Sequence, residues 1–308
     1  APNDLYKIRY EEKVEEEIPT PALEIESLLD LAAQSFDQSQ LTGHYRSSSL
    51  DLIDFSNQHF YKNSLKFLPD YVGVNERSPG ISYVKVDGVW KNNANQIEVE
   101  KVIEILKELQ HTDQTIGVVT FNYFQQQAIQ EVVEKEGIHA KDLFVKNIEN
   151  VQGDERDIII FSMGYAEDEK GRLSMQFGSL NMQGGENRLN VAVTRARKKI
   201  YFVTSLWPQQ LNTDSLANEG PKVLKAYMQY AQEVSEGRYK PSPVSMPGFR
   251  VDWFLREKLL QEKPSLVREL PFADLTIKAE AVYKGLVLTD DDLYYRSGSS
   301  KEPHAYLP

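Results

Sequence analysis

Two arginines lie seven residues apart in the segment RLNVAVTRAR, at Arg188 and Arg195. On a helix they share one face with Val191 and Ala192, which stand at the intervening positions i+3 and i+4. A guanidinium fork binds two phosphate oxygens at once, so this face forms a strip of positive charge that suits an anion. The alternative interpretation is a basic helix that faces solvent beside a strand.

A second polar block, QGDERD at residues 152–157, directly precedes the apolar run Ile158–Met163. Gly153 permits close approach of the backbone to a ligand, and Glu155 can accept hydrogen bonds from sugar hydroxyls. The alternative is a charged turn before a core strand. Dense polar chemistry beside apolar strands is the usual layout of a ligand site on an α/β sheet.

Strands and helices alternate along the chain with short connections, which predicts a parallel sheet covered by helices over residues 41–205. The apolar patterns predict strands at 81–86, 116–120, 157–163 and 199–205. They predict helices at 22–33, 49–60, 97–109, 123–134, 187–197 and 221–234. The fold class is therefore α/β.

The ends of the chain have a different composition. Residues 1–21 are acidic and rich in proline at their end, which predicts a connector, and the main domain then spans 22–234. Residues 235–249 have linker composition. A second unit at 250–308 is predicted to contain a helix at 251–262 and strands at 275–277 and 285–288.

Composition excludes some classes of site and location. The 308 residues include no cysteine, which removes disulfides and cysteine-ligated metals and agrees with a reducing compartment. No apolar run is long enough for a signal peptide or a membrane span, so we expect a cytoplasmic protein without a membrane partner. The net charge of −11 argues mildly against nucleic acid, although Arg195–Lys199 is locally basic.

Taken together, the two polar blocks resemble motifs V and VI of superfamily 1 helicases. The resemblance is to the branch that includes the nonsense-mediated-decay helicase and its bacterial relatives. Motif V of that branch, Q-G-x-E-x-D, is matched by residues 152–157. Motif VI, R-L-N-V-A-x-T-R-A, is matched by residues 188–196.

Further matches occur in the order of the family. The triplet His44-Tyr45-Arg46 resembles its Q-Y-R segment, although His44 stands where Gln is common. Asn95 and Glu98 open the next helix as in the family, and IGVVT at 116–120 with Gln125 downstream resembles a further motif. The resemblance covers about residues 22–232 and implies a RecA-like, P-loop-NTPase-type parallel sheet with helices on both faces.

The resemblance also implies roles for individual residues. Arg195 corresponds to the arginine finger, and Arg46 to a second arginine that reaches the γ-phosphate of ATP. Among residues implied to contact the nucleotide are Gly153, Glu155, Gln152, Arg188 and Tyr45. Those implied to contact a single strand are Thr120, Gln125 and Asn147, the last standing where the family usually has Ser or Thr.

The sequence contains no G-x-x-x-x-G-K-[ST] and no acidic Walker B block in its first half. We therefore expect ATP and Mg²⁺ to be held mainly by an N-terminal RecA-like domain of the same protein. This chain would be the second such domain and would not hydrolyse ATP by itself. The implied partner is single-stranded nucleic acid, with DNA favoured over RNA. The rival interpretation is a non-catalytic nucleic-acid-binding scaffold that keeps the fold.

The C-terminal unit resembles the small nuclease-like domain that often ends bacterial helicases of this branch. Asp274 would be its first metal-binding acid, but Leu288 stands where the second acid belongs, so we expect an inactive remnant. A nuclease acting through residues 250–308 is a third interpretation. His59, His111, His139 and His304 show no ligand spacing, so no metal site is predicted.

Aromatic residues could also stack on the bases of a single-stranded nucleic acid. The candidates are Phe121, Tyr123 and Phe124, which follow the predicted β-strand at 116–120 and lie close to the predicted path of the nucleic acid. Core packing is the expected role of these three, and also of the tryptophans Trp90, Trp207 and Trp253.

Overall fold

The computed structural model describes residues 32, 34, 36, 37, 43–67, 78–240, 251–268 and 275–287. The chain divides into two units, Ala1–Thr42 and Gly43–Pro308. The predicted connector at 1–21 lies outside the described residues, as does all of the predicted helix at 22–33 except residue 32. The predicted boundaries at 21/22 and 249/250 fall there too.

The centre of the second unit is a parallel sheet of five strands in the order β3-β7-β6-β4-β5. Every pair of neighbouring strands in it is parallel. The strands are β3 (Ile81–Lys85), β4 (Ile116–Thr120), β5 (Phe144–Asn147), β6 (Arg156–Ser162) and β7 (Ala196–Thr204). The predicted α/β class is thereby confirmed.

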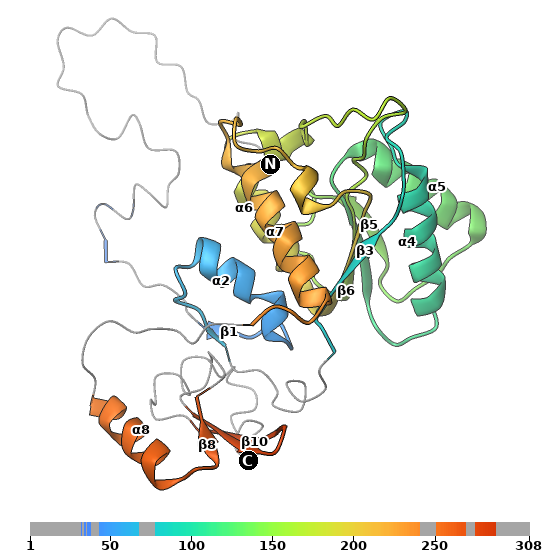
Figure 1. The fold of residues 1–308 in the computed structure, drawn as a ribbon. Helices are drawn as coiled ribbons and strands as arrows, with labels where there is room; N and C mark the ends of the chain where they lie inside the picture. The colour runs from blue at the N-terminus through green and yellow to red at the C-terminus, as the bar shows by residue number, and fades with distance from the viewer. Residues whose placement is uncertain are drawn as a thin grey trace, which may run out of the picture. The chain divides into compact units, whose positions relative to one another are not determined.

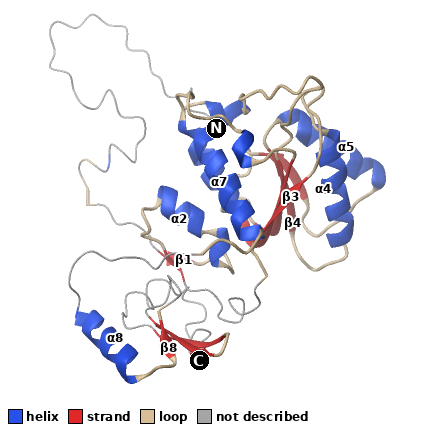
Figure 2. Cartoon of the chain, viewed as in Figure 1, coloured by secondary structure: helices blue, strands red, loops and turns tan. Residues whose placement is uncertain are grey.

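Both faces of the sheet are buried, which explains the continuous apolar run in β6. Ile159 and Phe161 point to one face, where they pack with residues of α6 (Gly185–Val193) and α7 (Glu219–Ser235). Ile158 and Ile160 point to the other, which is covered by α4 (Gln96–Leu109) and α5 (Tyr123–Glu136). Figure 1 shows the two helix layers on either side of the strands, and Figure 2 shows the strands between them.

Short elements complete the α6–α7 side of the domain. The strand β1 (Gly43–His44) pairs in parallel with β2 (Lys66–Phe67). Between them lie η2 (Leu50–Leu52) and α2 (Asp54–Phe60), and the ring of Phe55 meets Tyr227 of α7 edge-on at 5.1 Å. Two further 3-10 turns, η3 (Gly178–Asn181) and η4 (Pro208–Gln210), follow β6 and β7.

Because the strands are parallel, their beginnings lie at one edge of the sheet and their ends at the other. We call these the amino edge and the carboxyl edge. Residues 148–155, which we call the crossing segment, connect the end of β5 to the beginning of β6 without a helix. Ile148 and Val151 of this segment are buried in the core on the α6–α7 side, so the segment packs on that face of the sheet.

Two elements differ from the sequence prediction. The helix predicted to reach Arg197 ends at Val193, because Ala196 already pairs with Arg156 in the sheet. The strand β5 was not predicted, because its sequence FVKN is short and half polar. It pairs with β4 at the edge of the sheet, and of its four residues only Val145 is buried.

The C-terminal part contains the helix α8 (Val251–Glu262), at its predicted bounds, and a small antiparallel sheet. Its strands are β8 (Leu266–Val267), β9 (Leu275–Ala279) and β10 (Val282–Val287), in the order β10-β9-β8. Asp274 and Leu288, on which the nuclease interpretation depends, lie outside the described residues. Among the described helices, none combines the length and the apolarity that crossing a membrane requires.

Candidate functional site

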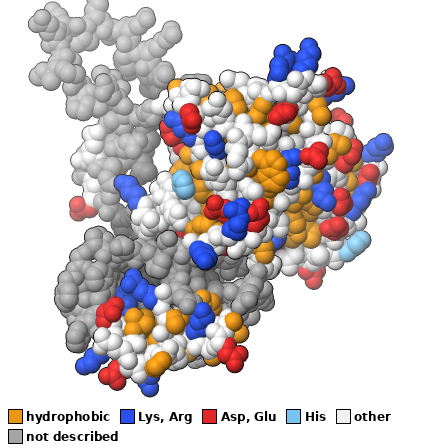
Figure 3. Space-filling model, in the orientation of Figure 1, with side chains coloured by type: hydrophobic (Ala, Val, Ile, Leu, Met, Phe, Trp, Pro, Cys, Tyr) orange, Lys and Arg blue, Asp and Glu red, His pale blue; other side chains and the backbone are white. Residues whose placement is uncertain are grey.

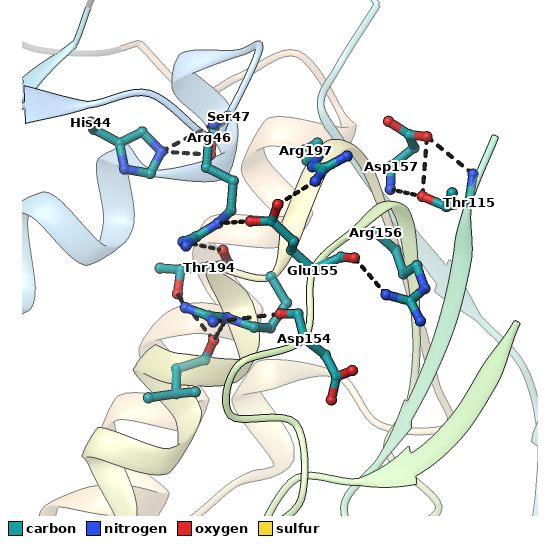
Figure 4. Close-up of polar contacts among 12 residues, drawn as sticks. His44, Arg46, Ser47, Thr115, Asp154, Glu155, Arg156, Asp157, Thr194 and Arg197 are labelled. Carbon is teal, nitrogen blue, oxygen red and sulfur yellow. Dashed lines mark hydrogen bonds and ion pairs between the residues drawn. The ribbon is translucent and has the colours of Figure 1, made fainter. Parts of the chain in front are cut away.

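Three segments distant in sequence meet at the amino edge of the sheet. They are the loop 44–48, the turn before β6 and the residues between α6 and β7. Ser48 docks this loop on β7, since its backbone N–H and its hydroxyl both donate to the carbonyl of Arg197, at 2.8 and 2.9 Å. Side chains from all three segments then face one another, as Figure 4 shows. We call them the arginine cluster: Arg46, Glu155, Thr194, Arg195 and Arg197.

Glu155 lies at the centre of the arginine cluster. Its Oε2 accepts a hydrogen bond from Nε of Arg46 at 2.7 Å, and its Oε1 accepts one from a terminal nitrogen of Arg197. Figure 4 shows the carboxylate between the two guanidiniums. The hydrogen bond from Arg197, followed by that from Arg46, lowers the pKa of Glu155, so this carboxylate is ionised at neutral pH.

Arg46 is positioned by two acceptors. Besides Glu155, the carbonyl oxygen of Thr194 accepts from its NH1 at 3.3 Å. The ring of Tyr45 lies beside this guanidinium, with the centroid 5.9 Å from its central carbon, and Tyr45 is 74% exposed. The side chains of Tyr45 and Arg46 therefore lie next to each other, and the ring of Tyr45 faces solvent.

His44 organises the turn that presents Arg46. Its Nε2 accepts a hydrogen bond from the backbone N–H of Ser47 at 3.2 Å and lies 2.8 Å from the Ser47 hydroxyl. Burial, and then the charge of Arg46, lowers the pKa of His44 to about 4. The ring is thus neutral at neutral pH, and its contacts are those of a structural residue.

Arg195 is half-buried, and all its hydrogen-bond acceptors are uncharged. Its Nε donates to the carbonyl of Val191 at 2.8 Å, and its NH2 donates to the hydroxyl of Thr194 at 3.1 Å. A longer bond of 3.5 Å joins its NH1 to the carbonyl of Asp154. Burial, followed by the charge of Arg46, lowers the pKa of Arg195, but a guanidinium remains protonated at neutral pH.

Within the described part of the chain, no carboxylate forms an ion pair with Arg195. Arg46 is close enough for its charge to disfavour the charged form of Arg195. A cationic site with one uncompensated guanidinium attracts an anion. The arrangement therefore suits the phosphates of a ligand.

The predicted strip of Arg188 and Arg195 on one helix face is not what the structure shows. Arg195 lies beyond the end of α6 and folds back on the carbonyl of Val191. Arg188 lies two turns earlier and donates to the carbonyl of Ser179 at 3.4 Å, away from the arginine cluster. The seven-residue spacing places two residues on one face only if both lie in the helix, and α6 ends before Arg195.

Gln152 and Gly153 are exposed in the crossing segment, next to the cluster in sequence. Gly153 has a φ of 88°, in the left-handed region that favours glycine, and apart from its own residue and its two chain neighbours nothing lies within 4 Å of where a Cβ would be. The glycine is thus required by the backbone turn, and its open side leaves the backbone accessible to a ligand.

The arginine cluster was not predicted to hold Mg²⁺, which we expect mainly on an N-terminal domain of the same protein. Mg²⁺ prefers carboxylate and water oxygens. The carboxylate of Asp154 is bound to Nζ of Lys146 at 2.6 Å, and that of Glu155 to two arginines. Among the residues that the structure describes, no group of three His, Cys, Asp or Glu side chains could hold a metal ion. The cluster fits phosphate groups and does not fit the metal.

The residues predicted to contact a single strand lie at the opposite, carboxyl edge. Thr120 and Asn147 end the neighbouring strands β4 and β5 and pair in register. Thr120 is buried, and its hydroxyl donates to the carbonyl of Asn122 at 2.9 Å. The side-chain oxygen of Asn147 accepts from the backbone N–H of Glu149 and the amide of Asn150, each at 3.1 Å.

Gln125 belongs to a buried polar network around Glu98 at the same edge. Its amide donates to the hydroxyl of Ser162 at 2.9 Å, and its oxygen accepts from the backbone N–H of Asn95 at 2.8 Å. Glu98 accepts four hydrogen bonds, from the backbone N–H groups of Gly164 and Ser205, the hydroxyl of Ser162 and the amide of Asn95. Its burial raises its pKa to about 7.

Sequence reasoning placed Asn95 and Glu98 at the start of a helix but missed this network. The N-cap is as expected, since the side chain of Asn95 accepts from the backbone N–H of Glu98. The only further signal was that Glu98 stands one turn before Val102, on the apolar face of the helix. Arg197 was also missed as a site residue, although the sequence marked its basic surroundings.

The three aromatic residues after β4 do not share one environment. Phe121 is buried as predicted, but Tyr123 and Phe124 are 55% and 50% exposed. Core packing was therefore the wrong prediction for these two, because Gln125 and not an aromatic residue turns inward at the start of α5. Their rings meet edge-on at 5.9 Å at the carboxyl edge.

Two of the tryptophans pack against other rings, as predicted. Trp90 stacks on Tyr165 at 4.9 Å, and Trp207 stacks on Tyr83 at 5.8 Å. The side chain of Trp253 lies outside the described residues.

The part of the chain that contains the parallel sheet is similar to known proteins. Residues 25–206 match the family described as AAA domain. The uncharacterized ATP-dependent helicase MG140 of Mycoplasma genitalium is 36% identical over 259 residues, which cover 77% of this chain and 23% of that protein. Its homolog in Mycoplasma pneumoniae is 35% identical, with the same two coverages.

More distant relatives carry related names. The DNA polymerase alpha-associated DNA helicase A of Saccharomyces cerevisiae is 27% identical over 150 residues, which cover 48% of this chain and 20% of that protein. Among solved structures, the C-terminal domain of a possible DNA helicase from Lactobacillus plantarum WCFS1 is 16% identical, with a TM-score of 0.33. That match covers 53% of this chain and 88% of that one. The chain thus spans about a quarter of the length of the curated relatives first named.

Proposed function

The chain belongs to the AAA-domain family as a superfamily 1 helicase-like domain, and on this premise we propose that it is the second RecA-like domain of an ATP-dependent helicase. In that role it completes an ATP site whose P-loop and metal ligands lie on a first RecA-like domain. It also provides part of the surface that binds single-stranded nucleic acid, with DNA favoured over RNA.

The observation that carries this proposal is the half-buried guanidinium of Arg195, which has only uncharged acceptors and stands beside Arg46. Phosphoryl transfer is catalysed mostly by positioning and by stabilisation of negative charge on the transferred group. ATP with its metal supplies that group when bound. Arg195 would stabilise the charge as it develops, and Arg46 would bind a terminal phosphate oxygen.

The residues around the two arginines have supporting roles in this proposal. Thr194 and Val191 fix the orientation of Arg195 through their hydroxyl and carbonyl groups. Gly153 and Gln152 offer exposed backbone and amide groups to the phosphate and ribose side of the nucleotide. Because the catalytic arginines and the P-loop belong to different domains, hydrolysis would require the two domains to close, which couples turnover to movement.

The second surface in the proposal is the carboxyl edge. Thr120, Gln125 and Asn147 would shape the loops that meet the strand, and the exposed rings of Tyr123 and Phe124 lie beside them. Bases of any sequence stack on aromatic rings, which suits a protein that moves along a strand. This use of Tyr123 and Phe124 is a proposal that follows from their exposure.

The test of the proposed function is the Arg195→Ala variant of the full-length protein that carries this chain. We expect its kcat for ATP to fall by about 10³-fold or more, because arginine fingers contribute about 10³–10⁵ in rate. Nucleotide affinity should change little, since the contact is made mainly in the transition state.

Arg238→Ala is the control for the loss of an arginine, because Arg238 is exposed beyond the end of α7 and its side chain pairs with nearby Glu236. It should leave kcat unchanged. A kcat for Arg195→Ala within a few-fold of the wild type would overturn the catalytic proposal and favour a non-catalytic scaffold that binds nucleic acid.

A further inference from the structure

Arg46 and Arg197 share one carboxylate. Each oxygen of Glu155 accepts from a different guanidinium, Oε2 from Arg46 at 2.7 Å and Oε1 from Arg197. The side chain of Arg46 is 21% exposed, so it is largely withdrawn from water. Two cations on one anion leave the group of three with a net positive charge.

A carboxylate oxygen and a phosphate oxygen are both anionic acceptors for a guanidinium. Glu155 therefore occupies Arg46 in the way that a phosphate would. For Arg46 to bind a phosphate of a nucleotide, its bond to Glu155 must be exchanged for the new one. The free energy of that exchange depends on what Glu155 retains when Arg46 has left.

We propose that Glu155 is an internal counter-ion that holds Arg46 in place until a nucleotide phosphate replaces it, and that Arg197 is the positioning residue that makes this exchange favourable. The inference rests on the proposed function, because it assigns to Arg46 a contact with the nucleotide. It goes beyond that function by giving a role to Arg197.

Arg197 is suited to this role by its place in the fold. It is the second residue of β7, and its carbonyl accepts two hydrogen bonds from Ser48, so its backbone is tied to the loop that carries Arg46. Its side chain reaches Glu155 from the side opposite Arg46. When Arg46 moves to a phosphate, Glu155 keeps Arg197 as its partner and is not left as an unpaired, half-buried anion.

Without Arg197, the exchange of Arg46 from Glu155 to a phosphate becomes less favourable. Within the cluster, Glu155 would then have Arg46 as its only hydrogen-bonded cation and would hold it more tightly. Fewer enzyme molecules would have Arg46 on the phosphate in the transition state, so kcat would fall. The loss would disappear if Glu155 were made neutral, because an amide does not compete with a phosphate for a guanidinium.

The experiment is a double-variant cycle in the full-length protein, with steady-state ATP hydrolysis as the readout. Arg197→Ala should lower kcat roughly five- to tenfold, the worth of one charge-assisted hydrogen bond in a partly exposed pair. The KM for ATP should change less. Arg197→Lys should recover part of kcat, because a lysine also supplies a cation to Glu155.

The decisive variant combines Arg197→Ala with Glu155→Gln. The proposal expects its kcat to exceed that of Arg197→Ala alone. If Arg197 only supports the fold, the second substitution cannot restore activity, and a kcat equal to or below that of Arg197→Ala overturns the inference. Should Arg197→Ala fail to fold, Arg197→Gln replaces it in the same cycle, since it removes the charge and keeps most of the side-chain stem.

Arg46→Ala separates the failure of this inference from the failure of the proposed function. If Arg46→Ala leaves kcat at the wild-type value, Arg46 has no catalytic contact, and the proposed role of Arg46 itself is wrong. If Arg46→Ala lowers kcat but the double variant shows no recovery, Arg46 keeps its proposed role and only the roles given to Glu155 and Arg197 are wrong.

Discussion

Glu98 and Glu155 illustrate how the same side chain acquires opposite properties within one domain. Glu155 faces two guanidiniums, which lower its pKa and keep it charged. Glu98 is buried among four donors without a full charge, and the loss of hydration raises its pKa to about 7. The first carboxylate can exchange partners, whereas the second holds the carboxyl edge together.

The buried Glu98 predicts a measurable effect of pH on stability. A carboxyl group whose pKa rises on folding from 4.5 to about 7 contributes stability in full below pH 4.5. That contribution is lost as the pH rises through about 7, and its size is about 3 kcal/mol. The wild-type free energy of unfolding, from urea titrations across this range, should contain this component.

The Glu98→Gln variant isolates the contribution of Glu98, because other titrating groups are the same in both proteins. The difference in unfolding free energy between wild type and variant should change between pH 4.5 and pH 7. The variant should also be less stable at every pH, since its amide nitrogen would face a backbone or side-chain donor. A difference that does not vary with pH would show that Glu98 does not change its protonation there.

At the scale of elements, two glycines allow α6 and α7 to begin against the same 3-10 turn. A Cβ on Gly185 would lie 2.3 Å from the carbonyl oxygen of Leu180, and one on Gly220 would lie 2.0 Å from the same atom. Both distances are far inside contact, and the obstacle is backbone, which cannot rotate away. The close approach of the two helices at η3 therefore depends on glycine.

Gly220→Ala should accordingly destabilise the domain, although alanine is the better helix former. We expect a loss of about 1–3 kcal/mol in the free energy of unfolding, the usual cost of overpacking. Gln229→Ala, an exposed position in the same helix, is the matched control and should be within about 0.5 kcal/mol of wild type. A Gly220→Ala variant as stable as this control would contradict the packing at η3.

The elements also show where sequence reasoning works and where it stops. The strand β4 has its predicted bounds because it is a short apolar run, and the helix α8 also has its predicted bounds. The end of α6 was missed, because it is set by pairing of Ala196 with a strand forty residues earlier, which local pattern cannot reveal. The edge strand β5 was missed because it lacks an apolar run.

In the candidate site, too, some features could be predicted from the sequence and others depend on tertiary contacts. The resemblance to a helicase family implied that Arg46, Glu155 and Arg195 serve one ligand, and in the structure the three side chains lie together at the amino edge. The partner of Glu155 could not be predicted, because Arg197 reaches it only through the geometry of two adjacent strands. Nor could the burial of Thr120 and Gln125 be anticipated from their polar types.

At the scale of the whole molecule, charge does not identify a nucleic-acid surface. The net charge is −11, and Figure 3 shows basic and acidic side chains interspersed on the described surface in view. Long-range attraction of a polyanion is therefore weak, and the proposed binding of a single strand would rely on local contacts. The exposed rings of Tyr123 and Phe124 are the local contacts that the carboxyl edge offers.

Replacement of both Tyr123 and Phe124 by alanine should weaken binding of a fluorescent single-stranded oligodeoxythymidylate. Each stacked base contributes about 1–3 kcal/mol, so we expect the affinity to fall at least roughly tenfold in an anisotropy titration. The control is His139→Ala, an exposed ring beyond the opposite end of α5. Equal affinities for the double variant and the wild type would exclude these two rings from the strand path.

The crossing segment joins the two edges on which these proposals depend. At its start, the backbone N–H of Ile148 donates to the carbonyl of Thr120 at the carboxyl edge, at 2.8 Å. Near its end, the carbonyl of Asp154 accepts from Arg195 at the amino edge. If a ligand at one edge shifted this segment, the binding equilibrium at the other edge would change with it.

Thermodynamic linkage makes that influence equal in both directions. If nucleotide lowers the affinity of the domain for a strand by some factor through the crossing segment, the strand lowers the affinity for nucleotide by the same factor. The coupling free energy between nucleotide and nucleic acid would then be a single equilibrium quantity, which could be measured by titrating either ligand.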